Sequence, residues 1–322
     1  MPAFLKERGG SEGELPYSLE QVKAATRRVY DEGRFTFATL PIRPFASGHT
    51  WFNQGVQEME GHELPQHEPV TVHFTYQFGD TNTYPHGKRQ RAREAALWAV
   101  DPPEYFTEGV YVAIVGPTYT AEQQAAVYQR FPEWSPQRHM FMDAPQRQAV
   151  RDLLGLASTF DGGVTILPKL YCHIDRYWGF LQNGRIPLGL QSMPLPFGCP
   201  QDALYDTVRW NNKGVKFREH TFLANRLVPA ALRDNRVRVS VAARGEAPPP
   251  STAHAVHLRY GTPMADVRAA VLLANPAARV VEIEAPHLKR LCRWLGTAEK
   301  NKAFNALQRY VPTLTLTPTL KP

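Results

Sequence analysis

Short β-rich runs alternate with segments of helical apolar spacing along most of this sequence, and this alternation constrains the fold more than any other feature. Strands are expected at 109–116, 163–168, 236–242, 254–259 and 279–284. Helices are expected between and after them, at 120–130, 144–159, 263–274, 286–295 and 298–310. Strands that alternate with helices are typical of βαβ units, in which neighbouring strands lie parallel. The sequence therefore predicts an α/β fold with a largely parallel sheet.

The first hundred residues carry fewer regular patterns. A helix is expected over 19–31, because Ser18 can cap its N-terminus and Gly33 follows its end. Strands are expected over 35–40 and 70–77. The second strand leads through a turn-rich loop into a helix expected over 88–100, which carries small alanines on one face and basic residues at its start.

Length and composition fit a globular chain of about two domains. The 322 residues are 43% hydrophobic and 21% charged, which is enough apolar material to bury a core. No apolar run reaches the roughly 20 residues that span a bilayer, and the polar N-terminus does not resemble a signal peptide. Lys and Arg number 37 against 30 Asp and Glu, a net charge of +7. This charge fits a phosphate-bearing ligand, but the basic residues are scattered, so no nucleic-acid partner is expected.

The strand, loop and basic helix start at 70–98 form the local unit with the clearest chemistry. Lys88, Arg89 and Arg91 open the helix, where backbone N–H groups and the helix dipole favour an anion such as a diphosphate. His73, within the strand, could ligate a divalent cation that bridges the same diphosphate. The alternative is a structural strand histidine followed by a solvated basic helix face, because no Walker-type or dinucleotide spacing occurs.

Three further clusters have both a structural and a chemical interpretation. The turn at 101–105 carries two carboxylates and two prolines, and a proline-stiffened helix end explains it without acid–base chemistry. Asp175 and Arg176 are either a local ion pair or acceptor-side residues, and the segment 217–220 has the same ambiguity. The three cysteines are too few for a disulfide scaffold or a Cys-only zinc site, although one pair could bridge in an oxidising compartment.

Several ordered motifs resemble glycosyltransferase family seventy-seven, the nucleotide-diphospho-sugar transferases, in the plant and green-algal branch of extensin arabinosyltransferases. The first runs from His73 through GKRQRAREA (87–95) to DPPEY (101–105). TILPKLYCHIDRYW (165–178), PFGCP (196–200) and FREHTFLAN (217–225) follow in the same order as in the family. The resemblance covers residues 35–225 well and the remainder loosely.

The resemblance implies a retaining glycosyltransferase with a GT-A-like fold, which moves a sugar, most readily arabinose, from a UDP-sugar to a cell-wall glycoprotein glycan such as hydroxyproline-linked arabinosides. It implies a Mn²⁺ or Mg²⁺ cofactor with His73 as a metal ligand, and Gly87 and Lys88 as residues that hold the donor diphosphate. It also implies a disulfide between Cys172 and Cys199 in the Golgi lumen. No motif identifies a catalytic nucleophile.

One departure from the GT-A pattern shapes the expected domain organisation. Residues 1–69 contain no Asp-x-Asp motif before the histidine strand, and no membrane anchor precedes them. The chain is therefore expected to be the C-terminal part of a longer enzyme, whose missing N-terminal anchor would supply its membrane attachment. Residues 1–118 would be the C-terminal portion of the GT-A-like domain, and 119–322 a second α/β domain on the acceptor side. The alternative is a non-catalytic carbohydrate- or glycoprotein-binding module, or an inactive fragment of such an enzyme.

Overall fold

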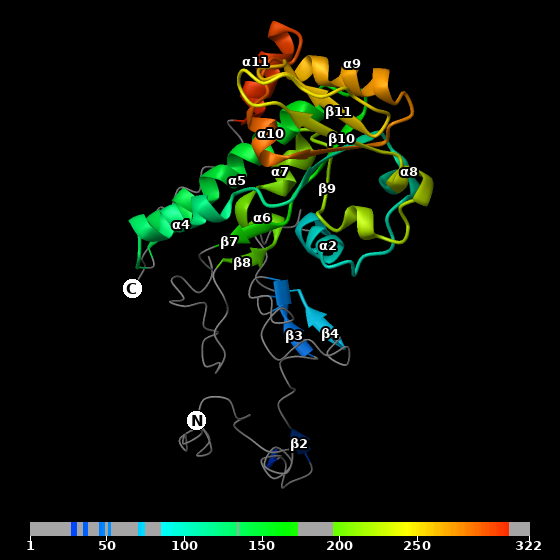
Figure 1. The fold of residues 1–322 in the computed structure, drawn as a ribbon. Coiled ribbons are helices and arrows are strands. Elements are labelled where there is room, and N and C mark those ends of the chain that lie inside the picture. Colours follow the sequence, from blue (N-terminus) through cyan, green and yellow to red (C-terminus); the bar gives the residue numbers. More distant parts are fainter. Residues whose placement is uncertain are drawn as a thin grey trace.

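The largest element of the fold is a parallel sheet of six strands (Figure 1). The computed structural model describes residues 27–30, 35–37, 45–48, 51–52, 70–74, 85–133, 135–172 and 196–308. In these residues the strand order of the sheet is β11-β10-β12-β5-β6-β9, and every neighbouring pair is parallel. Its strands are β5 (Val110–Val115), β6 (Gly163–Ile166), β9 (Phe217–Arg218), β10 (Arg236–Val241), β11 (Ala255–Leu258) and β12 (Val280–Glu284). The α/β class with a largely parallel sheet is confirmed.

Helices cover both faces of this sheet. One face packs against α5 (Pro136–Ala157), α9 (Met264–Ala274) and α10 (Ala285–Lys289), with α11 (Ala298–Gln308) at its margin. The other face packs against α3 (Pro103–Thr107), the 3-10 turn η7 (Phe222–Ala224) and α8 (Ala230–Asp234). β5 is apolar on both faces, as is typical of strands between two helical layers, whereas β12 has Val281 and Ile283 on one face and Val280 with two glutamates on the other.

Smaller elements lie outside the six-stranded sheet. Within the described residues, three two-stranded sheets pair β1 (Arg27–Tyr30) with β2 (Phe35–Phe37), β3 (Phe45–Ser47) with β4 (Thr71–His73), and β7 (Leu170–Cys172) with β8 (Phe197–Cys199). The remaining helices are α2 (Pro85–Glu94), α4 (Ala121–Arg130), α6 (Gln201–Leu204) and α7 (Thr207–Asn212). A second core cluster joins β3, β7, β8, α5, α6 and α7, so the α2 region and the disulfide region share buried apolar contacts.

The strands and helices expected from 109 onward are found close to their expected bounds, with two differences in helices. The helix expected to start at 144 starts at Pro136, where Ser135 accepts a hydrogen bond from the Arg138 backbone N–H at 3.1 Å. It continues through Pro145 because the residues on either side, Met142 and Ala149, are 1% exposed and packed in the core. The helix expected at 286–295 is short and ends at Lys289.

Two expectations for the N-terminal part are wrong. Arg27–Tyr30 form a strand paired antiparallel with β2, where a helix over 19–31 was expected; residues 19–26 lie outside the described part. The helix expected over 88–100 spans Pro85–Glu94 instead. It ends in a Schellman turn, with Ala96 at φ 55° and Leu97 N–H donating to the Ala92 carbonyl at 2.8 Å. An alanine occupies the left-handed position where glycine is usual, so the sequence gives no stop signal there.

The sheet includes strands from both sides of the expected domain boundary at 118/119. β5 lies between β12 and β6, and it precedes that boundary in the chain. A cut at residue 118 would therefore remove a central strand from the sheet. None of the helices in the described ranges is long and apolar enough to cross a bilayer.

Candidate functional site

The first turn of α2 is the best-defined place for an anionic ligand among the expected site residues. Gly87 is buried, Lys88 is exposed, and Arg89 is half-buried. The first turn of α2 contains no acidic residue, so no carboxylate within that turn neutralises the positive end of the helix dipole. Lys88 is therefore positioned to add an ammonium charge to an anion bound at this turn.

His73 lies at the end of β4, on a different element from α2. β4 pairs in parallel with β3, and His73 is opposite Ser47 in the register. The His73 side chain is exposed. Among the described residues, no group of three or more His, Cys, Asp or Glu side chains is placed to hold a metal ion. These residues alone therefore do not make up a site for Mn²⁺ or Mg²⁺, and we derive no metal-dependent step from them.

Arg91 occupies a different environment from the one expected of a diphosphate ligand. Its side chain is 1% exposed, and its Nε donates to both carboxylate oxygens of Asp202 on α6, at 3.0 and 2.9 Å. The guanidinium carbon also lies 5.8 Å from the centre of the Phe52 ring. Within the described ranges, Nη1 and Nη2 are buried and have no hydrogen-bond partner. The main contact of the Arg91 side chain in this structure is therefore a buried ion pair that joins α2 to α6.

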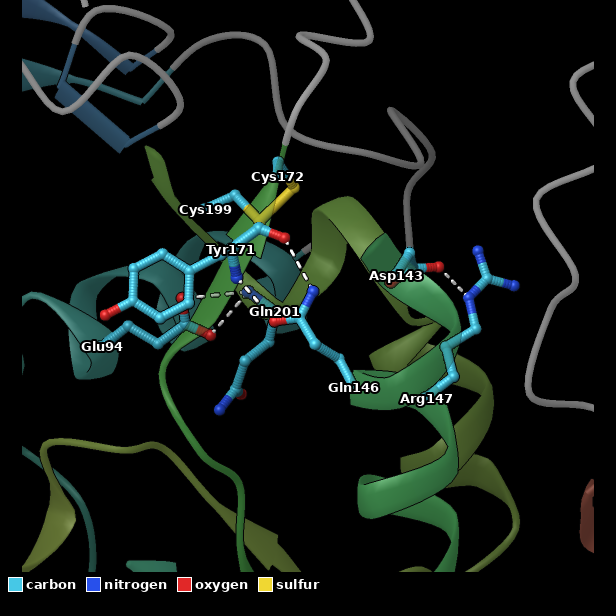
Figure 2. Close-up of a disulfide and its surroundings, with 8 residues drawn as sticks. All are labelled: Glu94, Asp143, Gln146, Arg147, Tyr171, Cys172, Cys199 and Gln201. Carbon is cyan, nitrogen blue, oxygen red and sulfur yellow. Dashed lines mark hydrogen bonds and ion pairs between the residues drawn. A yellow bond between two sulfur atoms is a disulfide. The ribbon is translucent and has the colours of Figure 1, made fainter. Parts of the chain in front are cut away.

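The same face of α2 makes two further polar contacts with α6. Gln90 Nε2 donates to Gln201 Oε1 at 2.7 Å. The Gln201 backbone N–H donates to both carboxylate oxygens of Glu94, at 3.0 and 3.1 Å (Figure 2). Three residues of α2 therefore bind two consecutive residues of α6, and all five side chains are buried. We call these five residues, Gln90, Arg91, Glu94, Gln201 and Asp202, the α2–α6 network.

A disulfide lies directly before α6. The sulfurs of Cys172 and Cys199 are 2.16 Å apart, which is the pair that the resemblance implies. The bridge joins β7 to β8, and only Pro200 separates it from Gln201 (Figure 2). A sequence separation of 27 residues gives a chain-entropy contribution of about 3 to 4 kcal/mol to stability. Cys292 is exposed and carries the remaining thiol.

Asp101, Tyr105, Glu108 and the 217–220 segment meet in a second polar cluster, whereas the Glu104 side chain is exposed. Tyr105 lies between two guanidinium groups, with Arg93 at 4.1 Å and Arg218 at 3.9 Å from its ring centre. Its hydroxyl donates to Glu219 at 2.6 Å, and Arg93 forms an ion pair with Asp101. Burial raises the pKa of Glu219, which is 1% exposed. These groups satisfy one another, so the cluster supports the structural interpretation of both segments.

The pKa of Glu94 predicts how stability depends on pH. Burial raises this pKa well above its ordinary value of 4.5, the Asp202 carboxylate raises it further, and the Gln201 hydrogen bond and Arg91 oppose the shift. Between pH 4.5 and the raised pKa, the folded state keeps a proton on Glu94 that the unfolded chain has lost. The free energy of unfolding should therefore fall as pH rises through this range. Glu94→Gln should flatten this decline, as measured by urea unfolding at several pH values. Equal slopes for the variant and the parent would contradict the assignment.

Other expected site residues fall outside the described part of the chain, and some important ones were not anticipated. Asp175 and Arg176 lie between residues 172 and 196, where the structure describes nothing. No sequence pattern predicts Glu94, Gln201 or Asp202 as members of a site. Their contacts join residues 107 to 111 positions apart, and no local pattern reveals such pairs.

Comparison with known proteins places this chain near a plant glycosyltransferase. No family model matches it, and no solved structure matches it significantly. It is 26% identical over 230 residues to "Arabinosyltransferase XEG113" of Arabidopsis thaliana, an alignment that covers 68% of this chain. The aligned part is 32% of the relative, so this chain spans about a third of that protein's length. The similarity supports a glycosyltransferase relationship.

Proposed function

We propose that this chain is part of a glycosyltransferase that transfers arabinose from a UDP-sugar to a glycoprotein glycan. The similarity to an arabinosyltransferase over 68% of the chain carries the proposal. The exposed Lys88 lies on a first turn of α2 that carries no acidic residue. It supports the part of the proposal that concerns the UDP-sugar donor, called the donor half, because it offers a charge-assisted contact to a diphosphate. In the reaction, Lys88 would stabilise the negative charge that develops on the departing UDP.

The disulfide supports a proposal about the cellular compartment in which this reaction takes place. Disulfides persist in oxidising compartments of the secretory pathway and are rare in the cytosol. The buried Cys172–Cys199 bridge therefore fits a lumenal enzyme, and we place the proposed activity in the Golgi. Hydroxyproline-linked arabinosides are the proposed acceptor, and retention at the anomeric carbon is the proposed stereochemistry.

Calorimetric titration with UDP tests the donor half of the proposal. The chain should bind UDP, and repeating the titration with Mn²⁺, with Mg²⁺ and with EDTA shows whether a metal contributes. An assay with UDP-arabinose and an arabinosylated hydroxyproline peptide then tests transfer, and NMR of the product gives the anomeric configuration. Absence of UDP binding under all these conditions would count against the proposal.

The second candidate is a non-catalytic carbohydrate- or glycoprotein-binding module. It is favoured by one observation, that the described residues do not assemble carboxylates around His73. Glycan binding without UDP binding or sugar transfer is the result that would select it. Turnover of a sugar nucleotide would eliminate it.

Lys88→Ala should weaken UDP binding while leaving the fold intact. The exposed ammonium makes no contribution to the core, so its loss should raise the dissociation constant about tenfold without lowering stability. Lys300→Ala, which removes an exposed lysine from α11, is the matched control and should bind UDP like the parent chain. Equal affinities for both variants would remove Lys88 from the donor site.

A further inference from the structure

The disulfide adds a short covalent link between β7 and the start of α6, which the chain itself joins only through a long segment. The strands β7 and β8 pair over three residues each, which gives little stability in isolation. Along the chain, Cys172 and Cys199 are separated by 27 positions, whereas the bridge brings their Cα atoms to 5.7 Å. The disulfide is therefore the short link that fixes the start of α6 relative to β7.

β7 itself is held firmly to the core. Gln146 on α5 is 0% exposed, donates to the Tyr171 carbonyl at 2.8 Å and accepts from the Tyr171 backbone N–H at 2.9 Å. β7 also begins soon after β6 of the six-stranded sheet ends. Figure 2 shows Gln146, Tyr171, the two cysteines, Gln201 and Glu94 in one group. A continuous path of contacts thus runs from α5 through β7, the disulfide and α6 to α2.

We propose that the Cys172–Cys199 disulfide positions α2 through Gln201 and Asp202, so that its reduction releases α2 and weakens ligand binding at the first turn of that helix. Gln201 and Asp202 are positioning residues in this scheme, since they act on the ligand only through α2. The structural half of this proposal is that the disulfide positions α2, and it rests on the contacts above. The ligand half is that reduction weakens ligand binding, and it rests on the proposed donor site.

The redox step needs only a dithiol reductant. The reductant supplies two electrons and two protons, the bond between the two sulfurs breaks, and Cys172 and Cys199 become thiols. The reductant closes to its own disulfide. After reduction, the three-residue β7–β8 pairing and the apolar core contacts of β8 and of Leu204 on α6 remain, but the covalent link to β7 is lost, so Gln90, Arg91 and Glu94 contact a less firmly positioned partner.

Hydrogen–deuterium exchange with and without dithiothreitol tests the structural half. A Cys292→Ser background removes the third thiol, so that only the disulfide responds. Reduction should raise exchange in peptides from α2 and α6 about tenfold and leave peptides from β10 and β12 unchanged. Thiol labelling confirms that the bridge is reduced. Unchanged exchange in α2 after complete reduction would overturn the proposal, and so would an equal rise across the sheet, because that describes global destabilisation.

UDP affinity with and without the reductant tests the ligand half. Gln201→Ala removes the contact with Gln90. Gln148→Ala makes the same change on α5, where the Gln148 side chain donates to Asp152 at 2.8 Å, outside the α2–α6 network. Reduction should raise the dissociation constant in the parent and in Gln148→Ala by the same factor. In Gln201→Ala the oxidised chain should already bind more weakly, and reduction should add a smaller factor. If reduction raises the dissociation constant of Gln201→Ala by the same factor as that of the parent, the disulfide acts on the ligand by a route other than Gln201.

The two halves can fail separately. If the oxidised parent chain does not bind UDP, the proposed donor function is wrong, and the exchange experiment still decides whether the disulfide positions α2. If UDP binds with equal affinity before and after reduction, the donor function stands and the proposed effect of the disulfide on ligand binding is wrong.

Discussion

Asp202→Asn is expected to lower the free energy of unfolding by about 3 kcal/mol, because it leaves the Arg91 guanidinium buried without its counter-ion. Arg91 and Asp202 have side chains 1% and 5% exposed, so water cannot replace the lost charge. Asparagine keeps one side-chain oxygen that can accept from the Arg91 Nε–H. The expected loss of stability is therefore at the lower end of the range for removing one partner of a buried ion pair. Urea unfolding of the parent and the variant at neutral pH measures the difference.

Asp206→Asn is the matched control for this experiment. Asp206 is exposed and caps α7 by accepting from the Arg209 backbone N–H at 2.9 Å, and asparagine caps helices equally well. Its stability should stay within about 0.5 kcal/mol of the parent. A loss of similar size in both variants would show that the Asp202 effect is not due to the buried ion pair.

The paired replacement Arg91→Met with Asp202→Leu separates charge from packing. Removing both charges leaves no uncompensated ion, so most of the stability lost in Asp202→Asn should return. The same double variant also tests the expected role of Arg91 at the donor diphosphate. UDP affinity equal to that of the parent would show that neither the Arg91 guanidinium nor its contact with Asp202 contributes to UDP binding.

The central sheet could be predicted because its signals are local. Val110–Val115 is apolar on both faces and Val280–Glu284 contains three β-branched apolar residues, and both runs are bounded by turn residues or helices, which is typical of strands buried between helical layers. The parallel arrangement followed from the alternation of strands with helices. Register and strand order did not follow, because residues in β5 pair with residues in β12 about 170 positions later.

The candidate site could be predicted only in part, and the reason is again the range of the contacts. The basic start of α2 is visible in the sequence as a run of neighbouring residues. The burial of Arg91 depends on Asp202, 111 positions away, and the sequence offers no pattern that connects them. The end of α2 at Glu94 was missed because an alanine, Ala96, takes the left-handed position.

The cluster around Tyr105 gives the segments 101–108 and 217–220 a shared structural role. Arg218 is 5% exposed and donates from Nε to the Tyr105 carbonyl at 2.9 Å and from Nη2 to Glu108 at 2.7 Å. Its guanidinium also stacks on the Tyr105 ring. Arg218 therefore joins β9, at the edge of the sheet, to α3 and to the residue that follows it. Each of these contacts uses the planar, forked geometry of arginine.

Arg218→Ala should therefore lower the free energy of unfolding by about 3 to 4 kcal/mol, because it removes the donor to the part-buried Tyr105 carbonyl, a charge-assisted bond and a cation–π contact. Arg218→Lys should recover little of this loss, since an ammonium group cannot make the fork contacts and the stacking together. Arg226→Ala, which removes an exposed arginine eight positions later, should stay within about 0.5 kcal/mol of the parent. Urea unfolding measures all three variants. Full recovery by lysine would mean that charge alone holds α3 against β9, and the argument from arginine geometry would then be wrong.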